Sequence, residues 1–286
     1  MLTVHRILTR PPRRTYASAV ARNRPGDPSE LNPSRRFESW SFTSRGLTLP
    51  VWDIPADNPA GPIAILSHGW GDSRLGALQR LPLIVASASR IIAWDMPGHG
   101  DAPGVCTLGA HEPVDLVNLL EHIQPDRPVM LYGWSMGAGI SIAAAAALAS
   151  STDSLARVRI HAVVAEAPYR FPRTPAHNML GAMRWPRHGL LGPALLVVSI
   201  RAPVLRRPGD FDRARLAGRV ACPLLVLHAN HDEICPRSDG EQIAIASPRA
   251  KAIFFGDSHH IDLWHDADRV REAAAAIASV GAANAH

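Results

Sequence analysis

The sequence predicts an α/β fold in which a mostly parallel sheet is covered by helices on both faces. From residue 46 onward, short apolar runs alternate with segments of helical spacing, the pattern of parallel strands joined by helical crossovers. Gly133-Trp-Ser-Met-Gly137 lies between an apolar run and an alanine-rich run, where a strand is expected to turn sharply into a helix. The 286 residues, 47% hydrophobic and 19% charged, suffice for one large domain of this class.

The individual elements follow in the order that this architecture needs. Strands are expected where short apolar runs end at turn residues, and helices where apolar residues recur every three or four positions. The predicted strands are 47–54, 62–67, 90–95, 128–132, 161–166, 223–228 and 251–255, and the predicted helices are 75–87, 111–123, 140–149 and 268–280.

Residues 168 to about 220 break this rhythm. Proline and arginine are dense there, around an apolar run at Leu190–Ile200, and no strand with a following crossover is evident. We expect an insertion that rises from the carboxyl ends of the strands, where open α/β sheets bind their ligands. Its apolar run either lines a substrate pocket or docks the insertion on the sheet.

The first 40 residues form a basic arm before a domain at 41–286. The arm holds eight arginines and three acidic residues, whereas 22 basic and 22 acidic groups balance in the remainder. The net charge of +5 therefore belongs to the arm, and without interleaved aromatic residues it predicts no nucleic-acid partner. The arm is either a targeting segment or a flexible, surface-laid leader, and it lacks the apolar stretch of a secretory signal.

Cysteine content and hydropathy indicate the cellular compartment expected for the chain. The three cysteines are scattered, so neither a disulfide framework nor a zinc site is expected, and a cytoplasmic location is the default. Residues 128–152 carry no charge, but their glycines and serines favour a strand, a turn and a helix over a membrane span. No stable membrane insertion, cofactor or metal is expected, and the oligomeric state is open.

Ser135 is the candidate nucleophile. The Gly-x-Ser-x-Gly turn raises a serine hydroxyl above the end of a sheet, over the N-terminus of a helix. Such a hydroxyl needs a base to take its proton and an acid to orient that base, in the chain order serine, acid, histidine. Asp232 follows the apolar strand 223–228 and is the candidate acid, with Glu166 as a possible substitute.

The candidate base follows the last predicted strand. Two neighbouring histidines occur there, and only one can face the serine; we favour His260 and keep His259 as the alternative. The backbone N–H groups of Trp70 and Met136 are the candidate donors of an oxyanion hole. Met136 directly follows the nucleophile, and the glycines around Trp70 would let that turn approach the substrate.

Other conspicuous residues are given structural roles. Asp95 is expected to shape the turn after its strand, where His99 is not taken as catalytic. Cys235 is expected to pack near the loop that carries Asp232. Trp134 is expected to pack below the candidate nucleophile.

Together these motifs resemble the α/β-hydrolase superfamily, in particular bacterial serine hydrolases related to monoacylglycerol lipases and serine aminopeptidases. The matching pieces span residues 45–280 and are Ser67-His-Gly-Trp-Gly71, Asp95-Met-Pro-Gly-His-Gly100, Gly133-Trp-Ser-Met-Gly137, 223–228 with Asp232 and Pro236, and His260-Ile-Asp-Leu-Trp264. The resemblance implies an eight-stranded, mostly parallel sheet, a lid inserted after the sixth strand, and a metal-free Ser-Asp-His triad. The chain departs from it at Asp101-Ala102, at Ala229 and in the doubled histidine.

The function expected from these residues is hydrolysis of a small-molecule carboxylic ester through an acyl-enzyme on Ser135. The same groups would also support amide or thioester hydrolysis, acyl transfer to an alcohol, or cyanohydrin cleavage, because a fold and a triad do not fix the acceptor. A non-catalytic ligand-binding scaffold is the alternative outside catalysis.

Overall fold

An eight-stranded sheet forms the centre of the structure, a computed structural model in which residues 2–151, 158–185, 188–260 and 262–282 are described. The strands lie in the order β1-β2-β4-β3-β5-β6-β7-β8, with β2 antiparallel to β1 and β4 and the remaining pairs parallel. The predicted α/β class, with a mostly parallel eight-stranded sheet, is confirmed. The strands are β1 (Glu38–Ser44), β2 (Leu47–Pro55), β3 (Ile63–Ser67), β4 (Arg90–Trp94), β5 (Val129–Trp134), β6 (Ile160–Glu166), β7 (Leu224–Ala229) and β8 (Ala250–Phe255).

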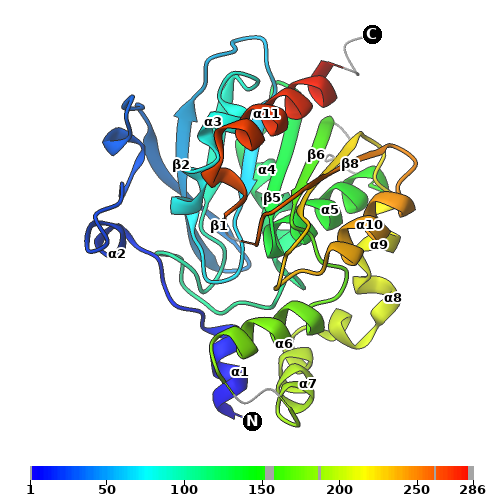
Figure 1. The fold of residues 1–286 in the computed structure, drawn as a ribbon. Coiled ribbons are helices and arrows are strands. Elements are labelled where there is room, and N and C mark those ends of the chain that lie inside the picture. Colours follow the sequence, from blue (N-terminus) through cyan, green and yellow to red (C-terminus); the bar gives the residue numbers. More distant parts are fainter. Residues whose placement is uncertain (1, 152–157, 186–187, 261, 283–286) are drawn as a thin grey trace.

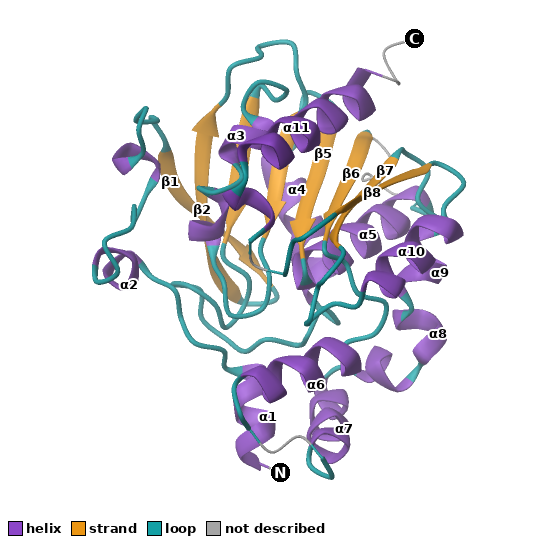
Figure 2. Cartoon of the chain, viewed as in Figure 1, coloured by secondary structure: helices purple, strands orange, loops and turns teal. Residues whose placement is uncertain are grey.

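Helices cover both faces of the sheet (Figures 1 and 2). One buried cluster joins the sheet to α3 and α11, and the other joins its opposite face to α4, α5 and α10. The helices are α1 (Leu2–Thr9), α2 (Tyr16–Val20), α3 (Leu81–Ile84), α4 (Glu112–Ile123), α5 (Met136–Ala149), α6 (Arg173–Ala182), α7 (Leu191–Arg201), α8 (Pro208–Phe211), α9 (Arg213–Ala217), α10 (Arg237–Ala246) and α11 (Ala267–Ala282), with short 3-10 turns at Pro28–Glu30, Arg74–Ala77, Pro203–Arg206 and Leu263–His265.

The elements that carry the elbow are the most deeply buried. Every residue of β5 is buried, as expected of a central parallel strand with helices on both sides. In α5, small alanine and glycine side chains let the helix lie close to the sheet, so nearly all of its residues are buried. Ser135, the candidate nucleophile, therefore lies between a buried strand and a buried helix.

The segment between β6 and β7 contains α6, α7, α8 and α9. In Figure 1, α6 and α7 lie beyond the carboxyl ends of the parallel strands, and α1 lies beside them. The apolar run Leu190–Ile200 corresponds to α7, whose Leu191, Ala194 and Val198 are buried. No helix in the described ranges combines the length and the apolar character that crossing a bilayer requires.

Several elements differ from the sequence predictions. The helix predicted at 75–87 is a 3-10 turn at Arg74–Ala77 followed by the four-residue α3, because Gly76 and Pro82 interrupt helical hydrogen bonding. The edge strand β1, the N-terminal helix α1 and the helix α10 were not predicted. In β1, exposed polar residues alternate with inward residues such as Phe42, and α10 carries Gly240, so neither shows the continuous apolar signal of the central elements.

Candidate active site

The β5–α5 junction holds Ser135 in a backbone conformation that few residues adopt. Its φ of 54° and ψ of −116° lie outside the ordinary regions, and its amide donates to the Glu166 carbonyl at 2.8 Å. A Cβ on Gly133 would come within 2.1 Å of the Gly137 carbonyl oxygen, and one on Gly137 within 1.9 Å of the Ser67 carbonyl oxygen. Both glycines are therefore required by close backbone contact.

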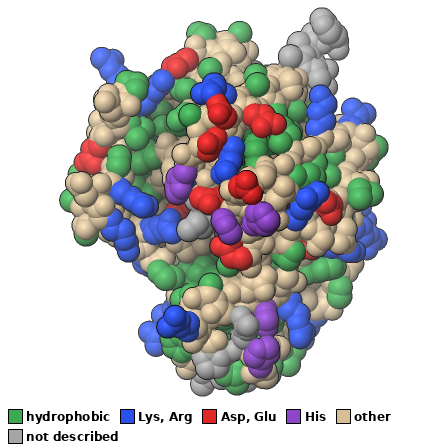
Figure 3. All heavy atoms as spheres, in the orientation of Figure 1, with side chains coloured by type: hydrophobic (Ala, Val, Ile, Leu, Met, Phe, Trp, Pro, Cys, Tyr) green, Lys and Arg blue, Asp and Glu red, His purple; other side chains and the backbone are tan. Residues whose placement is uncertain are grey.

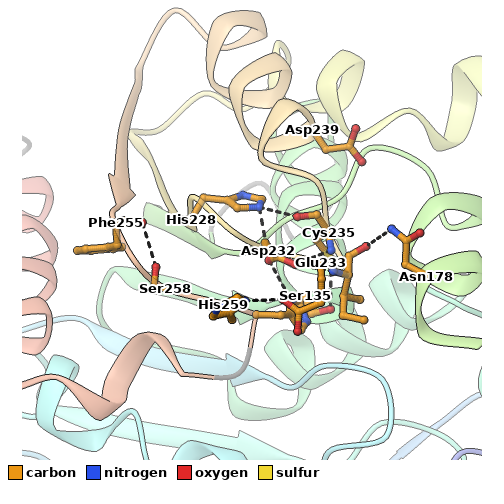
Figure 4. Close-up of polar contacts among 12 residues, drawn as sticks. Ser135, Asn178, His228, Asp232, Glu233, Cys235, Asp239, Phe255, Ser258 and His259 are labelled. Carbon is orange, nitrogen blue, oxygen red and sulfur yellow. Dashed lines mark hydrogen bonds and ion pairs between the residues drawn. The ribbon is translucent and has the colours of Figure 1, made fainter. Parts of the chain in front are cut away.

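Asp232 lies in the loop after β7, and its two carboxylate oxygens have separate partners (Figure 4). Oδ1 accepts the backbone N–H groups of Ile234 at 2.9 Å and Cys235 at 2.7 Å. Oδ2 lies 2.7 Å from Nδ1 of His260, which comes from the segment after β8. The Asp232 side chain is fully buried and that of His260 is 14% exposed. Because the loop amides occupy Oδ1, Oδ2 of Asp232 is the oxygen that faces the His260 imidazole.

The neighbouring histidine points elsewhere. Nδ1 of His259 lies 3.3 Å from Oε2 of Glu233, and both side chains are more than half exposed. Figure 3 shows histidine and acidic side chains gathered at the middle of one face, and the exposed pairs after β7 and β8 include His259 with Glu233 and His231 with Asp257. Of the two candidate bases, His260 contacts the candidate acid and His259 does not.

Ser135 is linked to the acid–histidine pair through Cys235. The hydroxyl Oγ lies 3.7 Å from Cys235 Sγ. That sulfur, a ring nitrogen of His260 and a carboxylate oxygen of Asp232 all lie within 4.8 Å of one another. Burial raises the pKa of the Cys235 thiol well above its usual value, so it stays protonated and can donate to the hydroxyl. Within the described ranges the hydroxyl makes no direct hydrogen bond to His260; such contacts often tighten only when substrate binds.

The same three residues are the one group whose ligand atoms lie close enough for a metal ion in the part of the chain described. Their existing bonds disfavour that use. Asp232 already accepts two amides and faces the imidazole, and the thiol is protonated.

His68 fixes the turn that carries the candidate oxyanion donor Trp70. Burial lowers the pKa of His68 to about 3, so the ring is neutral: Nδ1–H donates to the Gly69 carbonyl at 2.8 Å, and Nε2 accepts the Met96 amide at 3.0 Å. A Cβ on Gly69 would lie 3.3 Å from the Cβ of Ser135, so this turn borders Ser135. Among described residues, the amides of Trp70 and Met136 donate to no other group.

Glu166 is held in a buried network below the elbow. Arg80 donates to its carboxylate from Nε at 2.8 Å and from Nη2 at 2.5 Å, and the Tyr132 hydroxyl donates at 2.7 Å. The Arg80 guanidinium also lies 3.9 Å from the centre of the buried Trp134 ring. These partners occupy Glu166, which makes no contact with either candidate base in the described ranges.

Other groups bordering the site have structural partners. Asp95 accepts the amides of Arg74 and Asp101 and pairs with the Arg74 guanidinium, while burial raises its pKa to about 6. Buried His99 faces the Pro97 carbonyl at 3.1 Å.

The sequence reading missed two contributors to the site. Nε2 of His228, which lies in β7, is 2.9 Å from the Cys235 carbonyl oxygen and 3.5 Å from Asp232 Oδ2, and so supports the acid loop. Arg80 was the other. No spacing in the sequence connects Arg80 to Glu166, so Arg80 could not have been found. His228, by contrast, stands near the end of a predicted strand, and that position was a usable signal.

Comparison with known proteins relates most of the chain to one family. The model of a family described as "Alpha/beta hydrolase family" matches residues 64–276. Over 83 residues the chain is 36% identical to the pimeloyl-(acyl-carrier protein) methyl ester esterase of Neisseria meningitidis serogroup B, a stretch that covers 28% of this chain and 30% of that protein. The chain thus spans less than a third of the length of the curated relatives it matches.

Two solved structures show the same fold over nearly the whole chain. An esterase of Pyrococcus furiosus superposes with a TM-score of 0.66 at 19% identity, covering 94% of this chain and 97% of that one. An esterase of Rhodococcus sp. ECU1013 has a TM-score of 0.60 at 21% identity, covering 86% and 99%.

Proposed function

The chain belongs to the alpha/beta hydrolase family, and from this premise we propose that it hydrolyses carboxylic esters through an acyl-enzyme on Ser135. The observation that carries the proposal is the Asp232–His260 hydrogen bond beside a serine held in an elbow. The family match and the ester-cleaving activity in the names of similar proteins support the reaction type.

In the proposed reaction, His260 acts first as base and then as acid. Because its Nδ1–H donates to Asp232, its Nε2 carries the free lone pair that takes the Ser135 proton. Asp232 orients the ring and stabilises the imidazolium while the serine oxygen attacks the ester carbonyl. The imidazolium then protonates the leaving alcohol, and water attacks the acyl-enzyme with the same histidine as base.

The negative oxygen of each tetrahedral intermediate would be stabilised by the amides of Trp70 and Met136. Both amides are free of other partners among the described residues, and the Trp70 turn borders the serine. The N-terminus of α5 adds a favourable dipole at Met136. One such donor is worth about 3–4 kcal/mol in the transition state.

We assign the 168–220 insertion as a lid that selects the substrate. Asn178 in α6 donates to the carbonyl of Ile234, in the acid loop, at 3.0 Å, so the insertion directly contacts the proposed machinery (Figure 4). We propose a small-molecule acyl ester as substrate and a cytoplasmic location. The exposed His259–Glu233 pair lies outside the proposed relay.

The test is turnover of chromogenic esters, thioesters and aminoacyl anilides by the wild type and by Ser135→Ala. The proposal requires ester turnover that falls by about 10⁴-fold or more in the variant. Faster turnover of thioesters or anilides than of esters would change the proposed substrate class and leave the proposed catalytic residues unchanged. Undiminished ester turnover by Ser135→Ala would refute it.

A further inference from the structure

The N-terminal helix α1 lies at the carboxyl edge of the sheet, next to the insertion, although it precedes the segment that the family match covers (Figure 1). Its Val4 and Leu8 are 1% and 0% exposed and belong to the same buried cluster as Leu191 and Val198 of α7. The helix is therefore packed into the folded core and is not a leader lying on the surface.

The carboxyl end of α1 has free carbonyl groups because of the two prolines that follow it. Leu8 O would ordinarily accept the amide of residue 12, but Pro12 has no N–H, and Thr9 O lacks a helical partner because α1 ends at Thr9, before the two prolines. Two long-range donors fill these places. The indole Nε1–H of Trp70 donates to Leu8 O at 2.8 Å, and the Cys106 amide donates to Thr9 O at 2.9 Å.

These two donors come from the two sides of the proposed oxyanion hole. Trp70 is the residue whose own amide faces the developing oxyanion in the proposed reaction. Cys106 Sγ lies 3.7 Å from the sulfur of Met136, which supplies the other amide. Arg13 adds hydrogen bonds from Nη1 to the carbonyls of Gly100 at 2.9 Å and Ala102 at 2.8 Å, which fasten the arm to the loop after β4.

The turn that carries Trp70 needs such an anchor. Gly71 has a φ of +70° with nothing within 4 Å of the position of a Cβ, and Gly69 has no side chain, so the turn itself holds little rigidity. His68 fixes it on one side through the Gly69 carbonyl, and Leu8 O fixes it on the other through the indole.

We propose that α1 is a positioning element of the active site: the Leu8 carbonyl, through the Trp70 indole, aims the Trp70 amide at the oxyanion. This inference rests on the proposed ester hydrolysis. It makes Trp70 a positioning residue by its side chain as well as a donor by its backbone, and it makes the arm a component of the working enzyme.

Trp70→Phe tests the link, because it keeps the backbone amide and an aromatic ring and removes only the indole donor. We expect kcat for a p-nitrophenyl ester to fall about tenfold to a hundredfold with KM within about twofold, since a misplaced donor loses part of the effect of a missing one. Affinity for a tetrahedral trifluoromethyl ketone adduct should fall by the same factor, while titration with a fluorophosphonate still counts one site per chain.

Trp40→Phe is the matched control. Its indole donates to Asp53 at 3.2 Å on the edge of the sheet, so the same atom is lost without contact to the site. We expect kcat and inhibitor affinity within about twofold of wild type. Equal effects of Trp70→Phe and Trp40→Phe, or a Trp70→Phe enzyme with unchanged kcat, would overturn the inference.

A chain lacking residues 2–12 gives a second, independent reading. If Leu8 acts through the Trp70 indole, Trp70→Phe should cost at most about twofold in the truncated background, because its acceptor is already gone. A full additional loss there would contradict the link. If the truncated chain does not fold, the comparison of the two tryptophan variants decides alone. A wild type that turns over no ester would instead refute the proposed function.

Discussion

The two oxygens of Asp232 face different partners, and this division distinguishes the two neighbouring histidines. Oδ1 is fixed by two loop amides, so only Oδ2 is directed toward the end of β8. His260 meets that oxygen, whereas His259 turns outward to Glu233. The sequence favoured His260 but kept His259 as the alternative, because neighbouring side chains in an irregular turn have no fixed period that would assign their directions.

Replacing the two histidines in turn tests this assignment. His260→Ala should lower kcat for the ester by about 10⁴-fold or more, since it removes the proposed base. His259→Ala should change it by less than about threefold, because its partner pair is exposed and weak. Steady-state kinetics on both variants checks the prediction. The reverse ranking would make His259 the base.

Arg80 and Glu166 offer a second residue-level test. Arg80→Met leaves the Glu166 carboxylate buried without its cation, which should reduce the free energy of unfolding by about 3–5 kcal/mol. Arg237→Met, in the exposed pair with Glu241, is the control and should cost less than about 1 kcal/mol. Urea unfolding measures both. Equal losses of free energy in the two variants would show that the buried Arg80–Glu166 pair contributes no more to stability than an exposed pair.

At the level of elements, the parallel strands and the elbow could be predicted from the sequence, but several of the flanking elements could not. Continuous apolar runs mark β3, β5, β6 and β7 because both faces of a central strand are buried. β1 is an edge strand with exposed alternate residues, and α1 owes its burial to contacts with residues near 70, 106 and 191–198. Such long-range contacts leave no local pattern in the sequence.

The elbow glycines are predicted to be irreplaceable for steric reasons. Gly137→Ala would push a methyl group into the Ser67 carbonyl and should cost about 3 kcal/mol of stability together with most of the activity. Gly192→Ala, in α7, meets no atom within 4 Å and should stabilise the chain by about 0.5–1 kcal/mol. Thermal unfolding of the two variants checks the contrast; a well-folded Gly137→Ala enzyme would contradict the elbow geometry.

For the whole molecule, buried neutral histidines govern stability in mild acid. Burial lowers the pKa of His68 to about 3, that of His99 well below its usual range, and that of His228 as well. The unfolded chain binds these protons near pH 6.5 whereas the folded chain does not, so their stabilisation is complete above pH 6.5 and is lost as the pH falls. Asp95, whose pKa is raised to about 6, opposes this by binding a proton in the folded state.

The folded chain therefore binds fewer histidine protons than the unfolded chain as the pH falls below 6.5, and each such proton lowers the free energy of unfolding by about 1.4 kcal/mol per pH unit. Urea unfolding at several pH values between 7 and 5 measures the slope. A slope of zero in this range would mean that the histidines are charged or exposed in the folded state.

The whole account depends on one activated hydroxyl, and reaction with a fluorophosphonate followed by peptide mapping tests it most directly. We predict one adduct per chain, on Ser135, that forms at least about 10³-fold more slowly in His260→Ala while forming at near the wild-type rate in His259→Ala. An adduct on another residue, or a wild-type chain that does not react at all, would contradict it.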